Sequence, residues 1–171
     1  MMSMRPKRIE PGPGQESVWD YPRPPRLEPT DDHIVVAYGD VIVADTRNAQ
    51  RLLETSQPPA YYIPPADVNT EVLTASLHRS FCEWKGQANY YDLSLPAGPL
   101  LNGRVDQVGW GYQTPSERYQ ALAGHFAFYA QMLACSVNGE LVQSNEGDFY
   151  GGWITSKVVG PFKGGPGSSF W

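Results

Sequence analysis

The fold of this chain is decided by residues 34–44, which read Ile-Val-Val-Ala-Tyr-Gly-Asp-Val-Ile-Val-Ala. Two apolar runs rich in β-branched residues flank Gly39-Asp40, and a two-residue turn of this type between such runs predicts a β-hairpin. Because both faces of the two strands are apolar, we expect the hairpin to be buried on both sides. The stretch therefore predicts a buried antiparallel pair of strands.

A second hairpin is predicted around Asn138-Gly139, which is the strongest two-residue turn signal in the chain. It places Cys135 opposite Val142, where a small buried hydrophobic residue fits. Further short strands are expected at residues 60–63, 86–95 and 107–112. Many short strands separated by turn signals predict a mainly β, antiparallel domain with little helix.

The composition limits the possible classes of function. The 171 residues fit a single domain, and the net charge of −5 argues against a nucleic-acid partner, which requires basic surfaces. No apolar run approaches the ~20 residues of a membrane-spanning helix. Residues 1–9 contain no apolar signal-peptide region. We therefore expect a cytoplasmic protein without a membrane partner.

Metal and cofactor sites have no support in the sequence. The two cysteines and three dispersed histidines form neither a disulfide framework nor the closely paired ligands of a zinc site, so no metal is expected. The glycine-rich segments are not followed by helical patterns and contain no nucleotide-binding fingerprint. We therefore expect no cofactor.

Seven of the sixteen prolines lie within residues 1–30, and they are expected to exclude a regular helix or strand ladder there. Large apolar residues, among them Trp19 and Tyr21, are interspersed with these prolines and need a docking surface. We therefore predict a flexible tail over residues 1–18. A single domain is predicted over residues 19–171, with a docked proline-rich arm at its start and a glycine-rich segment at its end.

The stretch most favourable for a functional site is residues 81–91, Phe-Cys-Glu-Trp-Lys-Gly-Gln-Ala-Asn-Tyr-Tyr, which combines a thiol, an ammonium group and four aromatic rings. A cationic neighbour such as Lys85 would lower the pKa of the Cys82 thiol. In a straight strand the two side chains would face opposite sides, but Gly86 permits a turn that brings them together. The alternative interpretation is a buried structural cysteine and a solvated lysine.

Aromatic residues near glycines form the second part of the predicted site. Aromatic rings with a few polar tips are typical of small-ligand pockets, although the same rings also fill ordinary cores. The group consists of Tyr61, Tyr62, Trp84, Tyr90, Trp110, Tyr129, Tyr150 and Trp153.

Several motifs together resemble the domain of unknown function 427 family, which is also filed as nucleotidyltransferase-like. They are residues 16–26 (Glu-Ser-Val-Trp-Asp-Tyr-Pro-Arg-Pro-Pro-Arg), 43–46 (Val-Ala-Asp-Thr), 61–64 (Tyr-Tyr-Ile-Pro), 81–86 (Phe-Cys-Glu-Trp-Lys-Gly) and 149–155 (Phe-Tyr-Gly-Gly-Trp-Ile-Thr). The resemblance implies a zinc-free β-tent, in which two small antiparallel sheets meet at an angle and enclose a cleft. The sequence contains no acidic metal-binding pair or glycine–serine motif of a nucleotidyltransferase.

The motifs and the aromatic group together predict a small-molecule-binding β-tent protein with an aromatic cleft, whose ligand is of unknown identity. The residues expected to contact the ligand are Tyr62, Trp84, Lys85, Tyr90, Trp110 and Tyr129. One alternative is an enzyme in which Cys82 is a reactive thiol tuned by Lys85. A second alternative is a protein-interaction module that uses the proline-rich arm and the C-terminal loop.

Overall fold

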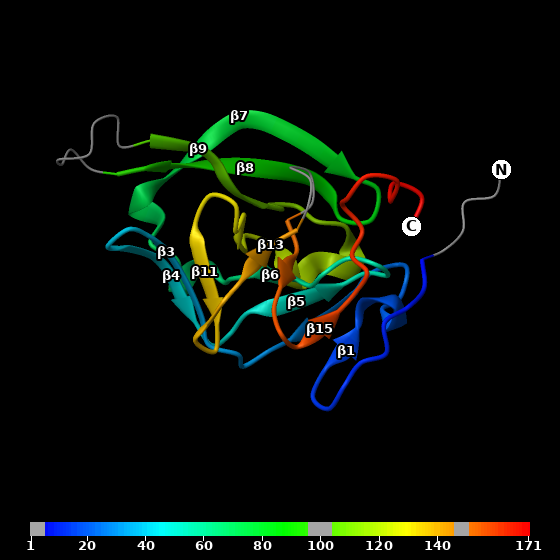
Figure 1. Ribbon diagram of the computed structural model, residues 1–171. Helices are drawn as coiled ribbons and strands as arrows, with labels where there is room; N and C mark the ends of the chain where they lie inside the picture. Colours follow the sequence, from blue (N-terminus) through cyan, green and yellow to red (C-terminus); the bar gives the residue numbers. More distant parts are fainter. Residues whose placement is uncertain (1–5, 96–103, 146–150) are drawn as a thin grey trace.

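The computed structural model describes residues 6–95, 104–145 and 151–171 (Figure 1). The strands are β1 (Glu16–Ser17), β2 (Arg26–Pro29), β3 (Ile34–Tyr38), β4 (Val41–Thr46), β5 (Gln50–Leu53), β6 (Ala60–Tyr62), β7 (Leu73–Cys82), β8 (Gly86–Ser94), β9 (Arg104–Gly111), β10 (Ala127–Phe128), β11 (Ala134–Val137), β12 (Glu140–Leu141), β13 (Gln143–Ser144), β14 (Trp153–Ile154) and β15 (Val158–Val159). The helical elements are the short 3₁₀ helices η1 (Val18–Asp20), η2 (Pro65–Asp67), η3 (Thr70–Val72) and η4 (Glu117–Leu122). The described chain is thus mainly β with almost no helix, as predicted.

Two four-stranded antiparallel sheets form the largest part of the fold. One has the strand order β10-β9-β8-β7, and the other has the order β12-β11-β3-β4. Figure 1 shows β7, β8 and β9 arching over the remaining strands. A three-stranded sheet, β2-β5-β6, and two pairs of short strands complete the described structure. Several small antiparallel sheets are therefore present, together with one parallel pair, β1 with β15.

Both predicted hairpin turns are confirmed. Tyr38 pairs with Val41 around Gly39-Asp40, and Val137 pairs with Glu140 around Asn138-Gly139. Asn138 and Gly139 have φ angles of 50° and 83°, the left-handed conformation that a two-residue hairpin turn favours. The expected burial of the first hairpin on both sides is wrong. Its outward face is open to solvent, since Ile42 is 50% exposed.

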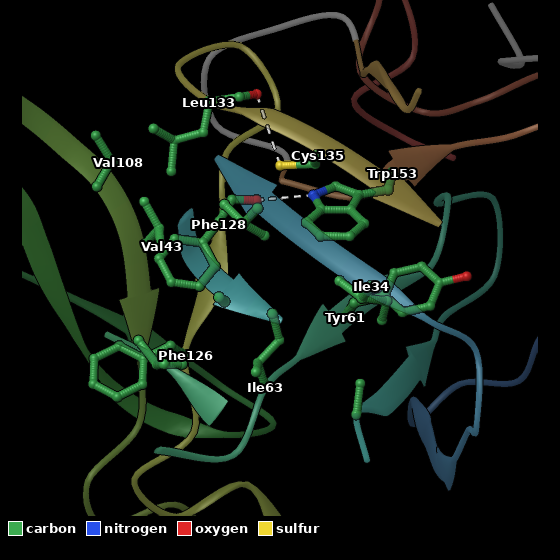
Figure 2. Packing of buried hydrophobic residues seen from close by; sticks show 14 of the residues in the cluster. Ile34, Val43, Tyr61, Ile63, Val108, Phe126, Phe128, Leu133, Cys135 and Trp153 are labelled. Carbon is green, nitrogen blue, oxygen red and sulfur yellow. Dashed lines mark hydrogen bonds between the residues drawn. The ribbon is translucent and has the colours of Figure 1, made fainter. Parts of the chain in front are cut away.

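The main core lies between the sheets and includes the fully buried Trp153. Figure 2 shows Trp153 packed near Ile34 and Tyr61, with its Nε1 donating a hydrogen bond to the Phe128 carbonyl at 2.8 Å. The Tyr61 and Trp153 rings stack with centroids 5.1 Å apart. Satisfying the indole N–H allows so large a side chain to be fully buried. Replacing such a residue with alanine typically costs about 3–5 kcal/mol.

The N-terminal arm packs on the domain from Glu16 onward. Val18 is fully buried, and Trp19 donates from Nε1 to the Pro161 carbonyl at 2.8 Å. The expectation that prolines exclude a strand here is wrong for β2, which pairs with β5. β2 lies at the edge of its sheet and carries Pro29 as its last residue, a position at which proline is compatible with a strand.

Membrane insertion through a helix has no basis in the described residues. None of the helices in residues 6–95, 104–145 and 151–171 is long and apolar enough to span a bilayer.

Candidate functional site

A pocket of about 270 Å³ lies beside the turn that joins β7 to β8. Residues of β5, β6, β8 and β9 also line it, and so do Gly151 and Gly152. Every residue that the sequence predicts as ligand-binding or catalytic lines this pocket: Tyr62, Cys82, Trp84, Lys85, Tyr90, Trp110 and Tyr129. The structure thus brings the whole predicted set together, while the roles of these residues stay predictions.

The turn after Cys82 presents Trp84 and Lys85 to the pocket. Cys82 pairs with Gly86 across it, and Gly86 has a φ of 104°, which side-chain-bearing residues rarely adopt. Ser116 donates its backbone N–H to the Lys85 carbonyl at 3.0 Å and its hydroxyl to the Trp84 carbonyl. These bonds satisfy backbone groups that the turn leaves unpaired. The predicted turn is therefore present, and Ser116, which lies outside the turn, holds its backbone in place.

Trp110 and Tyr62 form one wall of the pocket. Trp110 donates from Nε1 to the Tyr62 hydroxyl at 3.2 Å, and the two rings meet edge to face with centroids 6.1 Å apart. The Tyr129 ring packs on Trp110 at 4.6 Å between centroids. The backbone of Gly151 lies so close to Trp110 that a Cβ atom there would be 2.2 Å from its ring. Only glycine, which lacks a Cβ atom, fits this close to the Trp110 ring.

Tyrosine hydroxyls supply the polar groups of the pocket. The Tyr90 hydroxyl lies 2.7 Å from Ser80 Oγ, and the exposed His78 packs its ring 4.5 Å from that of Tyr90. Burial raises the pKa of Tyr129, and the neighbouring Tyr90 raises it further. Burial likewise raises the pKa of Tyr112, with added contributions from Tyr62, Cys82 and Tyr90. Tyr112 and Tyr129 are therefore neutral phenols at physiological pH.

Lys85 places a positive charge among these rings. Its Nζ lies 5.4 Å from the centroid of the Tyr112 ring, within the range of a cation–π contact. Burial opposes the charged form, but interactions with Tyr62, Cys82 and Glu54 outweigh this effect and raise the pKa of Lys85. The side chain is therefore an ammonium at neutral pH, which suits an electrostatic role and does not suit a nucleophilic or basic one.

The two cysteines differ in their surroundings. Cys135 is 1% exposed, its thiol faces the Leu133 carbonyl at 3.7 Å, and burial raises its pKa to about 12 (Figure 2). The prediction of a small buried hydrophobic residue at this position is confirmed. Cys82 is half-buried and borders the pocket, where it interacts electrostatically with Lys85.

Sequence reasoning missed several residues that line the pocket. Tyr112 is one of them. It is the last residue of the aromatic strand predicted at residues 107–112, so the sequence did offer a reason to include it in the site. Glu54 had no comparable signal. It is held by Arg23 at 3.5 Å and by Gln57 at 3.0 Å. Lys163 also lines the pocket, from the glycine-rich C-terminal segment.

Three residues of the predicted aromatic group are not part of the described pocket. Tyr150 lies outside the described residues, whereas Tyr61 and Trp153 belong to the main core.

Metal binding has no evident site in the described part of the chain. Within it, no group of three or more histidine, cysteine, aspartate or glutamate side chains is arranged to hold an ion.

Comparison with known proteins identifies one family. A family model with the description NTP_transf_9, Domain of unknown function (DUF427), matches residues 26–142, which is more than half of the chain. The match includes every predicted site residue and stops before Gly151, Gly152 and Lys163. No curated protein matches the chain.

Proposed function

The chain belongs to the DUF427 family, and because that description carries no activity, we propose a function from the pocket itself: the protein binds a small organic molecule there. One observation carries the proposal. Six predicted contact residues, drawn from distant parts of the sequence, line one concave site of about 270 Å³. Small-ligand sites are typically concave, largely apolar and supplied with a few convergent polar groups.

The pocket has the features of a preformed binding site. Its apolar walls come from rings and from Leu52, Pro58 and Ala60, while the tyrosine hydroxyls and Lys85 supply polar contacts. Ser116 fixes the turn that carries Lys85. A site held in this way loses little conformational entropy when a ligand enters. For the fold, we propose that the two four-stranded sheets correspond to the walls of a β-tent, which the family resemblance supports.

A fragment screen by protein-observed NMR tests the proposal. Binding fragments should shift the indole N–H signals of Trp84 and Trp110, which line the pocket, and should leave that of the core residue Trp153 in place. The matched variant pair is Tyr90→Ala, which removes a pocket ring, and Tyr38→Ala, which removes a half-buried ring that lies outside the pocket. The proposal fails if no fragment binds, or if the fragments bind both variants equally well.

A second candidate function is thiol chemistry at Cys82. It is favoured by the position of Cys82 at the same pocket, in electrostatic contact with the Lys85 ammonium. The thiolate is the nucleophilic form of cysteine. In this alternative the Cys82 thiolate adds to an electrophilic double bond of the bound molecule: a C–S bond forms, the π bond breaks, and the resulting anion takes up a proton from water. A faster reaction of Cys82 than of a free thiol with the same electrophile would support it.

A further inference from the structure

Lys85 adds only hydrogen-bond donors to the polar groups that line the pocket. Tyr62, Tyr90, Tyr112 and Tyr129 each carry one hydroxyl proton, and a lysine ammonium carries three N–H donors and no acceptor. Trp110 uses its indole N–H on the Tyr62 oxygen, so that oxygen already accepts a bond. Lys85 also interacts with the Tyr62 side chain. Because each tyrosine hydroxyl can both donate and accept, the group that calls for an added acceptor is the Lys85 ammonium.

Neither carboxylate that lines the pocket forms a salt bridge with Lys85. Glu54 helps to raise the pKa of Lys85, but it is also engaged by Arg23 and by Gln57, at 3.5 Å and 3.0 Å. Glu83 lies on the same turn as Lys85 but is exposed to solvent. Among the described residues, no carboxylate oxygen lies within the 4.0 Å of Lys85 Nζ that defines a salt bridge. The ammonium thus faces the pocket without a protein counter-anion at that distance.

A cationic ligand is disfavoured by the same arrangement. Aromatic pockets often bind quaternary ammonium groups through the faces of their rings. Here the ammonium of Lys85 already lies over the ring of Tyr112. A second cation would be repelled by this ammonium, whereas an anion would be attracted.

The size and walls of the pocket limit the rest of the ligand. Its volume of about 270 Å³ is below the roughly 300–1,000 Å³ of sites for drug-sized molecules. The rings of Trp110 and Tyr129 offer flat surfaces for an unsaturated body. A compact, planar ligand satisfies both constraints.

We infer that the pocket binds a small aromatic carboxylate of one or two rings, whose carboxylate contacts Lys85 and the neighbouring phenol hydroxyls. This inference rests on the proposed function and narrows it to one class of ligand. The carboxylate oxygens provide both acceptors and a counter-charge for the Lys85 ammonium. The apolar ring of the ligand displaces water from the surface of the Trp110 ring.

The inference is tested with three matched probe sets: benzoate, 2-naphthoate and indole-3-carboxylate, the corresponding amides, and the corresponding methylamines. Isothermal titration of the wild-type protein should show the carboxylates binding at least tenfold more tightly than the amides, with the amines weakest. This comparison requires no variant and therefore does not depend on how a variant folds. Lys85→Met should abolish the advantage of the carboxylates, and Lys85→Arg should retain most of it.

Lys157→Met is the matched control, because Lys157 is exposed, lies 3.8 Å from Asp32 and does not line the pocket. It should leave the advantage of the carboxylates unchanged. If amides or amines bind in the pocket as tightly as carboxylates, the inference is overturned and the proposed function stands. If neither these probes nor the fragment screen yields a pocket ligand, both are overturned.

Discussion

Trp110 donates its indole N–H to the hydroxyl oxygen of Tyr62 at 3.2 Å, and both groups are buried. The two residues belong to different sheets, since Trp110 lies on β9 and Tyr62 on β6. This bond therefore helps to fix the relative position of two sheets at the wall of the pocket. A buried donor that loses its acceptor carries the full cost of its desolvation.

We expect Tyr62→Phe to lower the free energy of unfolding by about 1–3 kcal/mol, because the Trp110 N–H loses its acceptor. Urea denaturation measures the change. Tyr91→Phe is the control, since the Tyr91 hydroxyl accepts a bond from Gln113 at an exposed position where water can replace it. Equal losses in the two variants would contradict the importance of the buried bond.

Cys82 and Cys135 should differ in their reaction with iodoacetamide near neutral pH. Cys135 is buried and its pKa is raised to about 12, so its thiolate is scarce and inaccessible. Cys82 borders the pocket and is half-buried. Peptide mass spectrometry after brief treatment should find Cys82 modified and Cys135 intact.

A pocket ligand should slow the modification of Cys82. Unfolding in urea should remove the difference between the two cysteines, which provides the control. Equal inertness of both thiols in the folded protein would refute the thiol chemistry proposed as the second function.

The sequence predicts the features of this fold that depend on neighbouring residues better than those that depend on residues distant in the chain. The turns at Gly39-Asp40 and Asn138-Gly139, and the turn that ends at Gly86, follow from local backbone preferences, and all three are present. The exposure of Ile42 was not predictable, because it depends on which face of β4 distant strands cover. For the same reason, the sequence did not place Tyr112 in the pocket.

The docking of the N-terminal arm should weaken in acid. Arg51 on β5 binds Glu16 of β1 and Glu28 of β2, and Tyr21 donates to Glu16. Burial alone would raise the pKa of Glu16, but its bonds from Tyr21 and Arg51 prevail and lower it below 4.5. A carboxyl group whose pKa is lowered by folding contributes stability above its unfolded pKa and loses it as pH falls through the folded pKa.

We therefore expect the amide of Glu16, which donates to the Lys157 carbonyl at 2.8 Å, to lose hydrogen-exchange protection below about pH 4.5. Protection factors corrected for intrinsic exchange rates measure this loss. The amide of Ile63, bonded to the Phe126 carbonyl at 2.7 Å, is the internal control and should stay protected. In Glu16→Gln, protection of the arm should be weak at every pH. A pH dependence as strong as that of the wild type would show that another group is responsible.

Gly151 should tolerate no side chain, because its backbone lies against the pocket wall. An added methyl group would lie 2.2 Å from the Trp110 ring, so Gly151→Ala must displace either the ring or the chain. We expect a loss of about 1–3 kcal/mol in urea denaturation, typical of overpacking, together with a shift of the Trp110 indole N–H signal. The matched control is Gly12→Ala, whose methyl group would meet only the end of the exposed Gln15 side chain, at 3.2 Å. If Gly151→Ala unfolds at the same urea concentration as the wild type and keeps the Trp110 signal in place, the close approach of Gly151 does not shape the pocket.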